Sequence, residues 1–230
     1  MNSLPNPHFI PVKTTLPLCP LNDPRSRVAI STARLLLRPV VPSDLPALYA
    51  IRSQPEVMAN NPQGRPDRDI DETRSRFAAF LPPQNEMTYN VAICLRDAPG
   101  SEMIGVGGCY RINSGVYGWP VIGYMFRREM WGRGIATEFL EAWLVMWREL
   151  PRVEREVLAH PASVVIDETG RAQEVVTAFV VDENAASRRV LEKCGFEKFH
   201  TKREADLRDP NKEVELIGFR YVVGGGGIEL

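Results

Sequence analysis

The chain has 230 residues, of which 44% are hydrophobic and 25% charged, which is typical of one large globular domain with a substantial core. Lysine and arginine total 28 against 29 for aspartate and glutamate, a net charge of −1. This balance gives no electrostatic case for binding nucleic acid or an anionic membrane, and no apolar run approaches the length of a membrane span.

The N-terminal segment, residues 1–30, is unusually rich in proline. Proline at that density forbids regular helix and favours extended chain. We expect an N-terminal extension that either lies along the domain surface or is disordered. The main domain is then expected over residues 31–223, and a flexible tail over 224–230, which opens with four glycines.

The first half of the domain is predicted to hold strands and two helices. The run 34–39 is expected as a first strand. Ser43 is expected to cap a helix, and Asp67 or Asp69 to start a second helix that ends at Pro82. Further strands are predicted over 89–95, 103–112 and 121–126.

In the second half, apolar residues recur at helical spacing from Ala136 to Leu150, and Pro151 stops that helix. The run 175–181 is apolar without alternation, which suits a strand buried on both faces, as in a parallel pair. The remaining elements expected are a helix over 184–193 with Gly195 after its last turn, and two antiparallel strands, 196–202 and 213–222, joined by a turn at 209–211.

A turn containing Gly132 and Gly134 joins the strand 121–126 to the long helix. The first N–H groups of a helix lack internal partners and carry partial positive charge, and glycines let a phosphate approach them closely. A Walker A loop is excluded because no Gly-Lys-Ser/Thr follows, and Thr137 stands where a Rossmann fingerprint needs its third glycine. A plain strand-to-helix turn is the alternative to an anion site.

Two segments together point to a family. The run Ile122-Gly-Tyr124, followed by Trp131-Gly-Arg-Gly-Ile-Ala-Thr-Glu138, resembles the cofactor motif of the GNAT acetyltransferases, specifically their RimJ/RimL-like branch. The segment 182–196, with Asn184 and Ser187, is similar to that family's next motif. Two motifs in the right order are far more specific than either alone.

The resemblance covers roughly residues 33–223 and implies the GNAT fold. This is an α/β (α+β mixed) fold, a mostly antiparallel mixed sheet of about seven strands, flanked by about four helices and containing a parallel central pair. The stretch 153–171 is longer than is usual in the family. We expect an extra hairpin arm or a lengthened strand there.

The resemblance also implies a cofactor, acetyl-CoA, and a place for it. Its pantetheine arm would lie along the backbone of Met125, Phe126 and Arg127, with Asn184 binding that arm or the acceptor. The diphosphate would lie on the glycine turn, formed by Trp131, Gly132, Arg133, Gly134, Ile135, Ala136 and Thr137.

For catalysis, the resemblance suggests that Ser187 gives a proton to the leaving thiolate, with Tyr124 and Tyr110 as alternative acids. Asn184 and Ser187 also have a purely structural reading as helix cap and first-turn hydroxyl. Relatives often carry a glutamate just before the Ile-Gly-Tyr run, but here Val121 occupies that position. No general base is therefore carried over, and the nearest acidic candidates are Glu102, Asp182 and Glu183.

The reading that follows is an acetyl-CoA-dependent N-acetyltransferase, in which a primary amine attacks the thioester directly. The alternatives are a non-catalytic acyl-CoA-binding module and, with little support, a dinucleotide oxidoreductase. The expected partner is a small-molecule or peptide amine that contacts the loop 60–69 with the turn 117–120 nearby. Nucleic acid and membrane are not expected partners, and a monomer or homodimer is expected.

The four cysteines form no Cys-x-x-Cys pair, and the three histidines have no metal-ligand spacing. Buried free thiols in a reducing compartment are therefore favoured over disulfides or a metal site. No signal peptide is visible, so a cytoplasmic location is expected.

Overall fold

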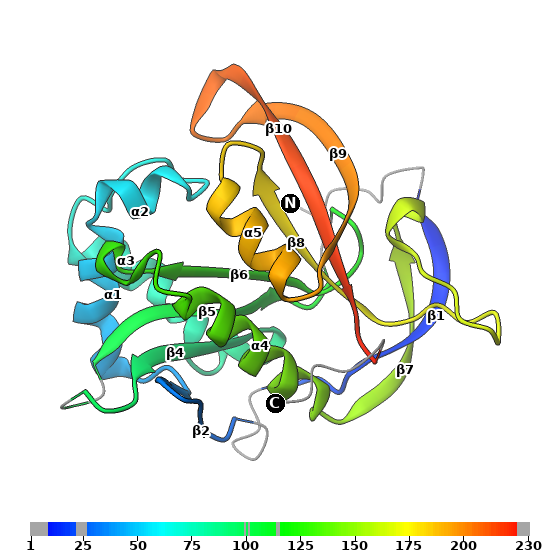
Figure 1. The fold of residues 1–230 in the computed structure, drawn as a ribbon, viewed down its shortest axis with the longest axis horizontal. Coiled ribbons are helices and arrows are strands. Elements are labelled where there is room, and N and C mark those ends of the chain that lie inside the picture. The colour runs from blue at the N-terminus through cyan, green and yellow to red at the C-terminus, as the bar shows by residue number, and fades with distance from the viewer. Residues whose placement is uncertain (1–8, 22–26, 99, 101, 114–115, 225–230) are drawn as a thin grey trace.

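A computed structural model describes residues 9–21, 27–98, 100, 102–113 and 116–224 (Figure 1). Its strands are β1 (Ile10–Pro17), β2 (Ile30–Ser31), β3 (Leu35–Arg38), β4 (Tyr89–Leu95), β5 (Met103–Arg111), β6 (Val121–Phe126), β7 (Arg152–Ala159), β8 (Val175–Val181), β9 (Glu197–Asp206) and β10 (Asp209–Val222). Its α-helices are α1 (Leu45–Arg52), α2 (Pro55–Ala59), α3 (Ile70–Phe77), α4 (Ile135–Arg148) and α5 (Ala185–Lys193). The expected extension and tail fall partly on 1–8 and 225–230, which lie outside the described residues.

Eight of these strands form one mixed sheet in the order β2-β3-β4-β5-β6-β8-β10-β9. Neighbouring strands are antiparallel except for β6 and β8, which run parallel and pair only at Val121 and Thr177. Beyond that pair the two strands diverge (Figure 1). The expected mixed α/β sheet with one parallel pair is confirmed. It has one strand more than expected because the short β2 pairs at the edge.

Helices cover both faces of the sheet. On the near face in Figure 1, α4 and α5 pack on the strands through a large cluster that includes Phe139, Trp143, Trp147 and Leu191. On the opposite face, α1 and α3 cover β4 and β5 through a second cluster. Strand β8 (175–181) is buried on both faces, as its apolar run without alternation predicted.

The first helical region differs from the expectation that Ser43 caps it. A 3-10 turn begins at Pro42, and α1 follows directly with no side-chain cap. The neighbouring Asp44 takes the capping role, since its carboxylate accepts the Val41 N–H at 2.9 Å and pairs with Arg38 at 2.6 Å. Asp44 rather than the expected Ser43 therefore bonds to the start of this helical region, and it is also ion-paired.

The second helical region was predicted better. Asp69, one of the two expected starts, caps α3 by accepting the Glu72 N–H at 2.8 Å. That helix already ends at Phe77. The short α2 was not predicted, because five residues are too few to show helical periodicity.

The closing hairpin turns earlier than predicted. β9 runs to Asp206 and β10 starts at Asp209, so the turn lies at Leu207 and Arg208 rather than at 209–211. The Asp206 carboxylate accepts the Arg208 N–H at 2.8 Å, a local side-chain turn that the sequence reading overlooked. Residues 209–211 lie within β10, where the pairing register shifts before Glu213.

The long stretch after α4 forms an arm, but not the hairpin that was one of the two expectations. β7 pairs along its full length with β1 from the N-terminal segment (right side of Figure 1). This two-stranded arm covers the sheet through a third cluster that includes Leu16, Trp119, Val157 and Val175. The expected turn at 167–170 is present, flanked by a single bridge between Ile166 and Ala172.

Candidate active site

The glycine turn between β6 and α4 is open to an anion. Gly132 and Gly134 have φ of 72° and 74°, in the left-handed region that favours glycine. A Cβ added at Gly132 would meet nothing within 4 Å, and one at Gly134 would meet only Arg34 Nη2 at 3.5 Å. Gly134 is the N-cap of α4, and no side chain of the described part of the chain caps that helix. The first turn of α4 therefore has no side-chain cap among the described residues, and the glycine turn before it is uncrowded.

Trp131 braces the start of this turn. Its indole Nε1 donates to the Phe126 carbonyl at 3.1 Å, and the Arg128 guanidinium lies 5.0 Å from the centre of its ring. Gln54, which the sequence analysis did not single out, holds the segment just before Trp131. Its Oε1 accepts the Arg128 N–H at 2.8 Å. A lone glutamine between two short helices carries no motif by which the sequence could have indicated it.

The diverging edge of β6 exposes backbone groups to the same space. Arg127 N–H donates to Ile104 O at 2.9 Å, so it is engaged within the sheet rather than available to a cofactor. Alternation along an antiparallel ladder then directs the backbone groups of Tyr124 and Phe126 away from β5, toward the gap left by β8. Met125, like Arg127, faces the β5 side of the ladder.

The structure brings together Tyr124 and Ser187, which lie far apart in the chain. The Tyr124 hydroxyl is buried and has no hydrogen-bond partner of good geometry. Burial raises the pKa of Tyr124, and the nearby Ser187 hydroxyl offsets part of that shift. The ring packs on Phe126 and Phe139, each 6.0 Å away between centroids. The hydroxyl of Tyr124 is thus protonated at neutral pH.

Asn184 is placed as the N-cap of α5. Its side-chain oxygen accepts the Ser187 N–H at 3.1 Å, so the structural reading of this asparagine holds. The cap also has a consequence for the site, because it fixes the first turn of α5 and with it the position of the Ser187 hydroxyl beside Tyr124.

The three acidic candidates for a general base are exposed and lie next to arginines. Glu102 pairs with Arg127, and Asp182 pairs with Arg188 at 2.7 Å. The Glu183 side chain is 80% exposed and lies 3.7 Å from Arg208. All three are therefore ion-paired groups on the surface of the protein.

The buried carboxylates of the described residues are engaged in ion pairs, although burial raises the pKa of Glu174. They are Asp44, Asp67, Glu174 and Asp206, and each pairs with an arginine. Val121, at the position where a glutamate is common in relatives, is 1% exposed.

A family model described as an acetyltransferase (GNAT) domain matches residues 34–197 of this chain. The chain belongs to the GNAT acetyltransferase family. It is an acyltransferase of a family that uses acetyl-CoA. No curated protein matches the sequence. In the described part of the chain, none of the helices is both long and apolar enough to cross a membrane.

Solved structures share the fold at low identity. A probable GNAT-family acetyltransferase from Chromobacterium violaceum has a TM-score of 0.63 at 20% identity, covering 86% of this chain and 87% of its own. A ribosomal-protein-S5-alanine acetyltransferase from Vibrio fischeri has 0.60 at 14%, covering 86% and 98%. A spermidine N-acetyltransferase from Vibrio cholerae, solved with CoA and spermine, has 0.60 at 14%, covering 84% and 97%.

In the expected acceptor loop, residues 60–69, polar side chains are engaged in hydrogen bonds within the protein. Gln63 donates to Asp67 at 2.8 Å and accepts from Arg52 at 3.1 Å. Arg208 of the β9–β10 hairpin contacts the chain just before this loop. Its guanidinium donates to the carbonyl of Ala59, the last residue of α2, at 3.1 Å. The turn expected to lie nearby, at 117–120, is buried under the arm.

Tyr117 and Tyr110 differ in their environment. Tyr117 is 1% exposed, and its hydroxyl lies 2.6 Å from His200 Nδ1, so it is part of the core. Tyr110 on β5 is 48% exposed, and its ring lies over Gly123 of β6, where an added Cβ would meet it at 3.2 Å. Alternation along β6 puts Gly123 on the opposite face from Tyr124, so Tyr110 lies away from the Tyr124–Ser187 pair.

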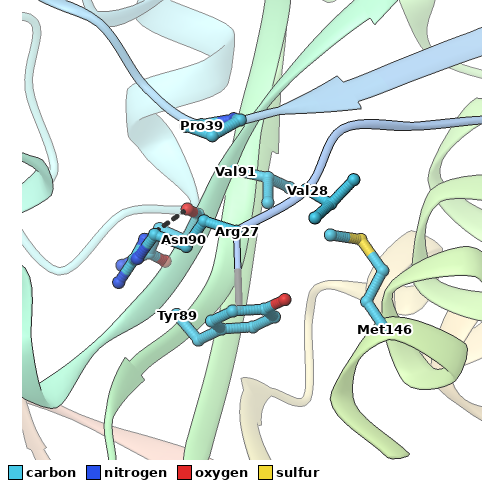
Figure 2. Close-up of a pocket in the computed structure, with 7 residues that line it drawn as sticks. All are labelled: Arg27, Val28, Pro39, Tyr89, Asn90, Val91 and Met146. Carbon is cyan, nitrogen blue, oxygen red and sulfur yellow. Dashed lines mark hydrogen bonds between the residues drawn. The ribbon is translucent and has the colours of Figure 1, made fainter. Parts of the chain in front are cut away.

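Two other depressions are not part of this site. One, at Arg27 and Tyr89, has no room for a water molecule (Figure 2). There the Arg27 guanidinium donates to backbone carbonyls of Leu21, Asn85, Thr88 and Asn90, so it anchors the N-terminal segment. The other, a cavity of about 390 Å³ beside the arm, is lined by Arg152, Glu154, Arg171 and Glu174 among others.

Proposed function

We propose that the chain is an acetyl-CoA-dependent N-acetyltransferase of the RimJ/RimL-like branch, acting on a primary amine. The observation that carries this proposal is the coincidence of an uncapped, unobstructed helix N-terminus with the divergence of β6 from β8. The turn offers N–H groups and a positive dipole for a diphosphate, and the open strand edge offers backbone groups for an amide-bearing arm. Acetyl-CoA would supply the activated acetyl thioester.

The residues that would hold acetyl-CoA divide between backbone and side chains. We assign the diphosphate to the turn from Trp131 to Thr137, and the pantetheine arm to the open edge at Tyr124 and Phe126. Arg133, which is exposed, is assigned to the phosphates as a charge partner. Arg127 is not assigned such a role, because its guanidinium pairs with Glu102.

Ser187 and Tyr124 are proposed to handle the proton of the leaving thiol. Ser187 would give its hydroxyl proton to the leaving thiolate and take one from Tyr124, whose hydroxyl burial keeps protonated, and the proton that the amine releases to water would return to Tyr124. Removal of the amine proton is assigned to water or to bulk buffer, since the buried carboxylates among the described residues are ion-paired. That arrangement favours amines with a low pKa, such as an α-amino group, over a lysine side chain.

We propose residues 31–223 as the catalytic domain, with the preceding residues as an extension that completes the arm. The pairing of β1 with β7 supports a structural role for the extension. The acceptor is proposed to enter on the face that bears Tyr110 and the loop 60–66.

The test is a thiol-release assay with acetyl-CoA over a panel of amines, beside calorimetric titration with acetyl-CoA and NADH. We expect acetyl-CoA to bind, NADH not to bind, and at least one amine to release thiol. Binding without turnover across α-amino, lysyl, polyamine and aryl amines would favour the second candidate, a non-catalytic acyl-CoA-binding module. The lack of an unpaired buried carboxylate among the described residues is the observation that favours that candidate.

A further inference from the structure

Residues 32–34, a short strap before β3, are bound by hydrogen bonds to Glu138 in the first turn of α4. Arg34 Nε donates to Glu138 Oε2 at 2.6 Å, and the Arg34 backbone N–H donates to Glu138 Oε1 at 2.8 Å. The Thr32 hydroxyl also donates to Glu138 Oε1, at 2.5 Å. From this anchored position Arg34 Nη1 donates to the Arg133 carbonyl at 2.8 Å. One carboxylate on α4 therefore aims an arginine at the glycine turn.

The bond to the Arg133 carbonyl determines the direction of a neighbouring N–H. In a trans peptide unit, the carbonyl of one residue and the N–H of the next point in opposite directions. Since Arg34 holds the Arg133 carbonyl on its own side, the Gly134 N–H must point to the other side. A glycine with a φ of 74° has no side chain to prevent this peptide from rotating, so an outside contact is needed to hold it.

The same contact removes an electrostatic conflict. Glu138 places a carboxylate in the first turn of α4, where it competes with a bound anion for the helix dipole and repels it. Partial burial alone would raise the pKa of Glu138, but the bonds from Thr32 and Arg34 hold it below its ordinary value, so the carboxylate stays charged. The Arg34 guanidinium offsets that charge at the place where an anion would bind.

We propose that Arg34 and Glu138 form a clasp that positions the Gly134 N–H for the diphosphate of the acyl donor, which makes both positioning residues. The inference rests on the proposed function, because it deepens the assignment of the glycine turn. The ligand that the clasp serves is any nucleoside diphosphate ester whose diphosphate lies on this turn. A ligand without the diphosphate would not depend on the clasp.

The experiment is calorimetric titration of Arg34→Met with CoA and with 3′-dephospho-CoA, and an NMR titration with pantetheine, which has no diphosphate. We expect CoA and 3′-dephospho-CoA each to bind about tenfold more weakly than to the wild type, and pantetheine to bind equally well. A general loss of structure would weaken all three ligands and would overturn the clasp. Weakening of CoA alone would also overturn it, because that result assigns Arg34 to the 3′-phosphate.

Two further variants sharpen the result. Arg34→Lys keeps the charge, but one ammonium group cannot hold both Glu138 and the Arg133 carbonyl in a fork, so we expect only partial recovery of affinity. Full recovery would reduce the clasp to a simple charge effect and overturn it. Arg171→Met is the matched control. Arg171 is 49% exposed and paired with Glu154, as Arg34 is 48% exposed and paired with Glu138, but it lies beside the arm.

CoA binding by the wild type and the two variants distinguishes failure of the clasp from failure of the proposed function. If the wild type does not bind CoA, the proposed function is wrong and the clasp has no ligand. If the wild type and Arg171→Met bind CoA and Arg34→Met binds it equally tightly, the proposed function stands and the clasp is wrong.

Discussion

The glycine turn and the acceptor side of this GNAT domain are built in opposite ways. The turn, its preceding strand and its helix form one continuous segment, 121–148, seated on the largest apolar cluster. The acceptor side joins segments that are far apart in the chain, and its contact from Arg208 to the Ala59 carbonyl spans 149 residues. A continuous segment can keep one ligand geometry while the distant segments around it vary. The backbone of the proposed cofactor turn thus depends on one local segment, whereas the proposed acceptor side depends on long-range contacts.

The two regions also differ in what holds them. The helix that follows the turn, α4, packs through aromatic side chains, with Trp143 and Trp147 stacked at 5.0 Å between ring centres. The acceptor loop depends on a buried polar network in which Asp67 pairs with Arg52 at 2.6 Å and accepts the Thr73 hydroxyl at 2.7 Å. Apolar packing tolerates changes of pH, whereas a network of charges does not. Variants in one region or the other therefore test whether the two regions respond separately.

The largest expected effect is on the turn, from Gly134→Asp beside Gly134→Asn. Both residues tolerate the left-handed backbone and have nearly the same shape, so the pair isolates charge. We expect Asn to weaken CoA binding about tenfold and Asp at least about 100-fold, roughly 3 kcal/mol, because a carboxylate repels the diphosphate. Calorimetric titration measures both. Equal affinities for the two variants would contradict an anion site at this turn.

The next effect is on the acceptor loop, through Asp67→Asn. Burial would raise the pKa of Asp67, but hydrogen bonds from Arg52, Thr73 and Gln63 hold it at about 2. A folded-state pKa below the unfolded value stabilises the protein above about pH 4, and this stabilisation is lost as the pH falls toward 2. We expect Asp67→Asn to lower the free energy of unfolding by about 2–3 kcal/mol at pH 7 and hardly at all at pH 2.

Urea unfolding at both pH values measures this difference, and CoA affinity at pH 7 should stay unchanged. A destabilisation of equal size at pH 7 and pH 2 would show that the Asp67 charge does not support the loop. A parallel loss of CoA affinity would show that the two regions are not independent.

A third change tests the proposed proton donor, Ser187, which lies beside Tyr124. We expect Ser187→Ala to lower kcat about 20-fold with little change in the KM for acetyl-CoA, since an acid acts mainly in the transition state. Ser187→Thr, which keeps a hydroxyl, is the matched control and should retain most of the rate. If KM rises while kcat stays constant, Ser187 is a binding residue and not an acid.

The smallest effect is expected from Arg208→Met, which releases the hairpin from the acceptor loop. We expect the KM for the amine to change about fivefold and the CoA affinity not at all, because the bond to the Ala59 carbonyl lies on the proposed acceptor side. Arg203→Met, on the adjoining strand β9 but outside this contact, is the control. An unchanged amine profile in Arg208→Met would move acceptor selection to another element, of which the arm is the next candidate.

Much of the cofactor half could be predicted from the sequence, for a physical reason. Strands β4, β6 and β8 occupy the residues expected, because apolar runs of that length are buried wherever they pack. Asn184 and Asp69 cap their helices as their residue types favour. Gly132 and Gly134 adopt the conformation that two glycines in a short turn permit. All of these depend on neighbours within a few residues.

What only the tertiary structure decided involves partners far along the chain. No local pattern shows that β7 pairs with β1 or that Tyr124 lies beside Ser187. Arg34 shows the same limit, since its bond to Glu138 spans 104 residues. A charged side chain carries no periodicity that names its partner, and its pairing is set by where the packed strands and helices place it.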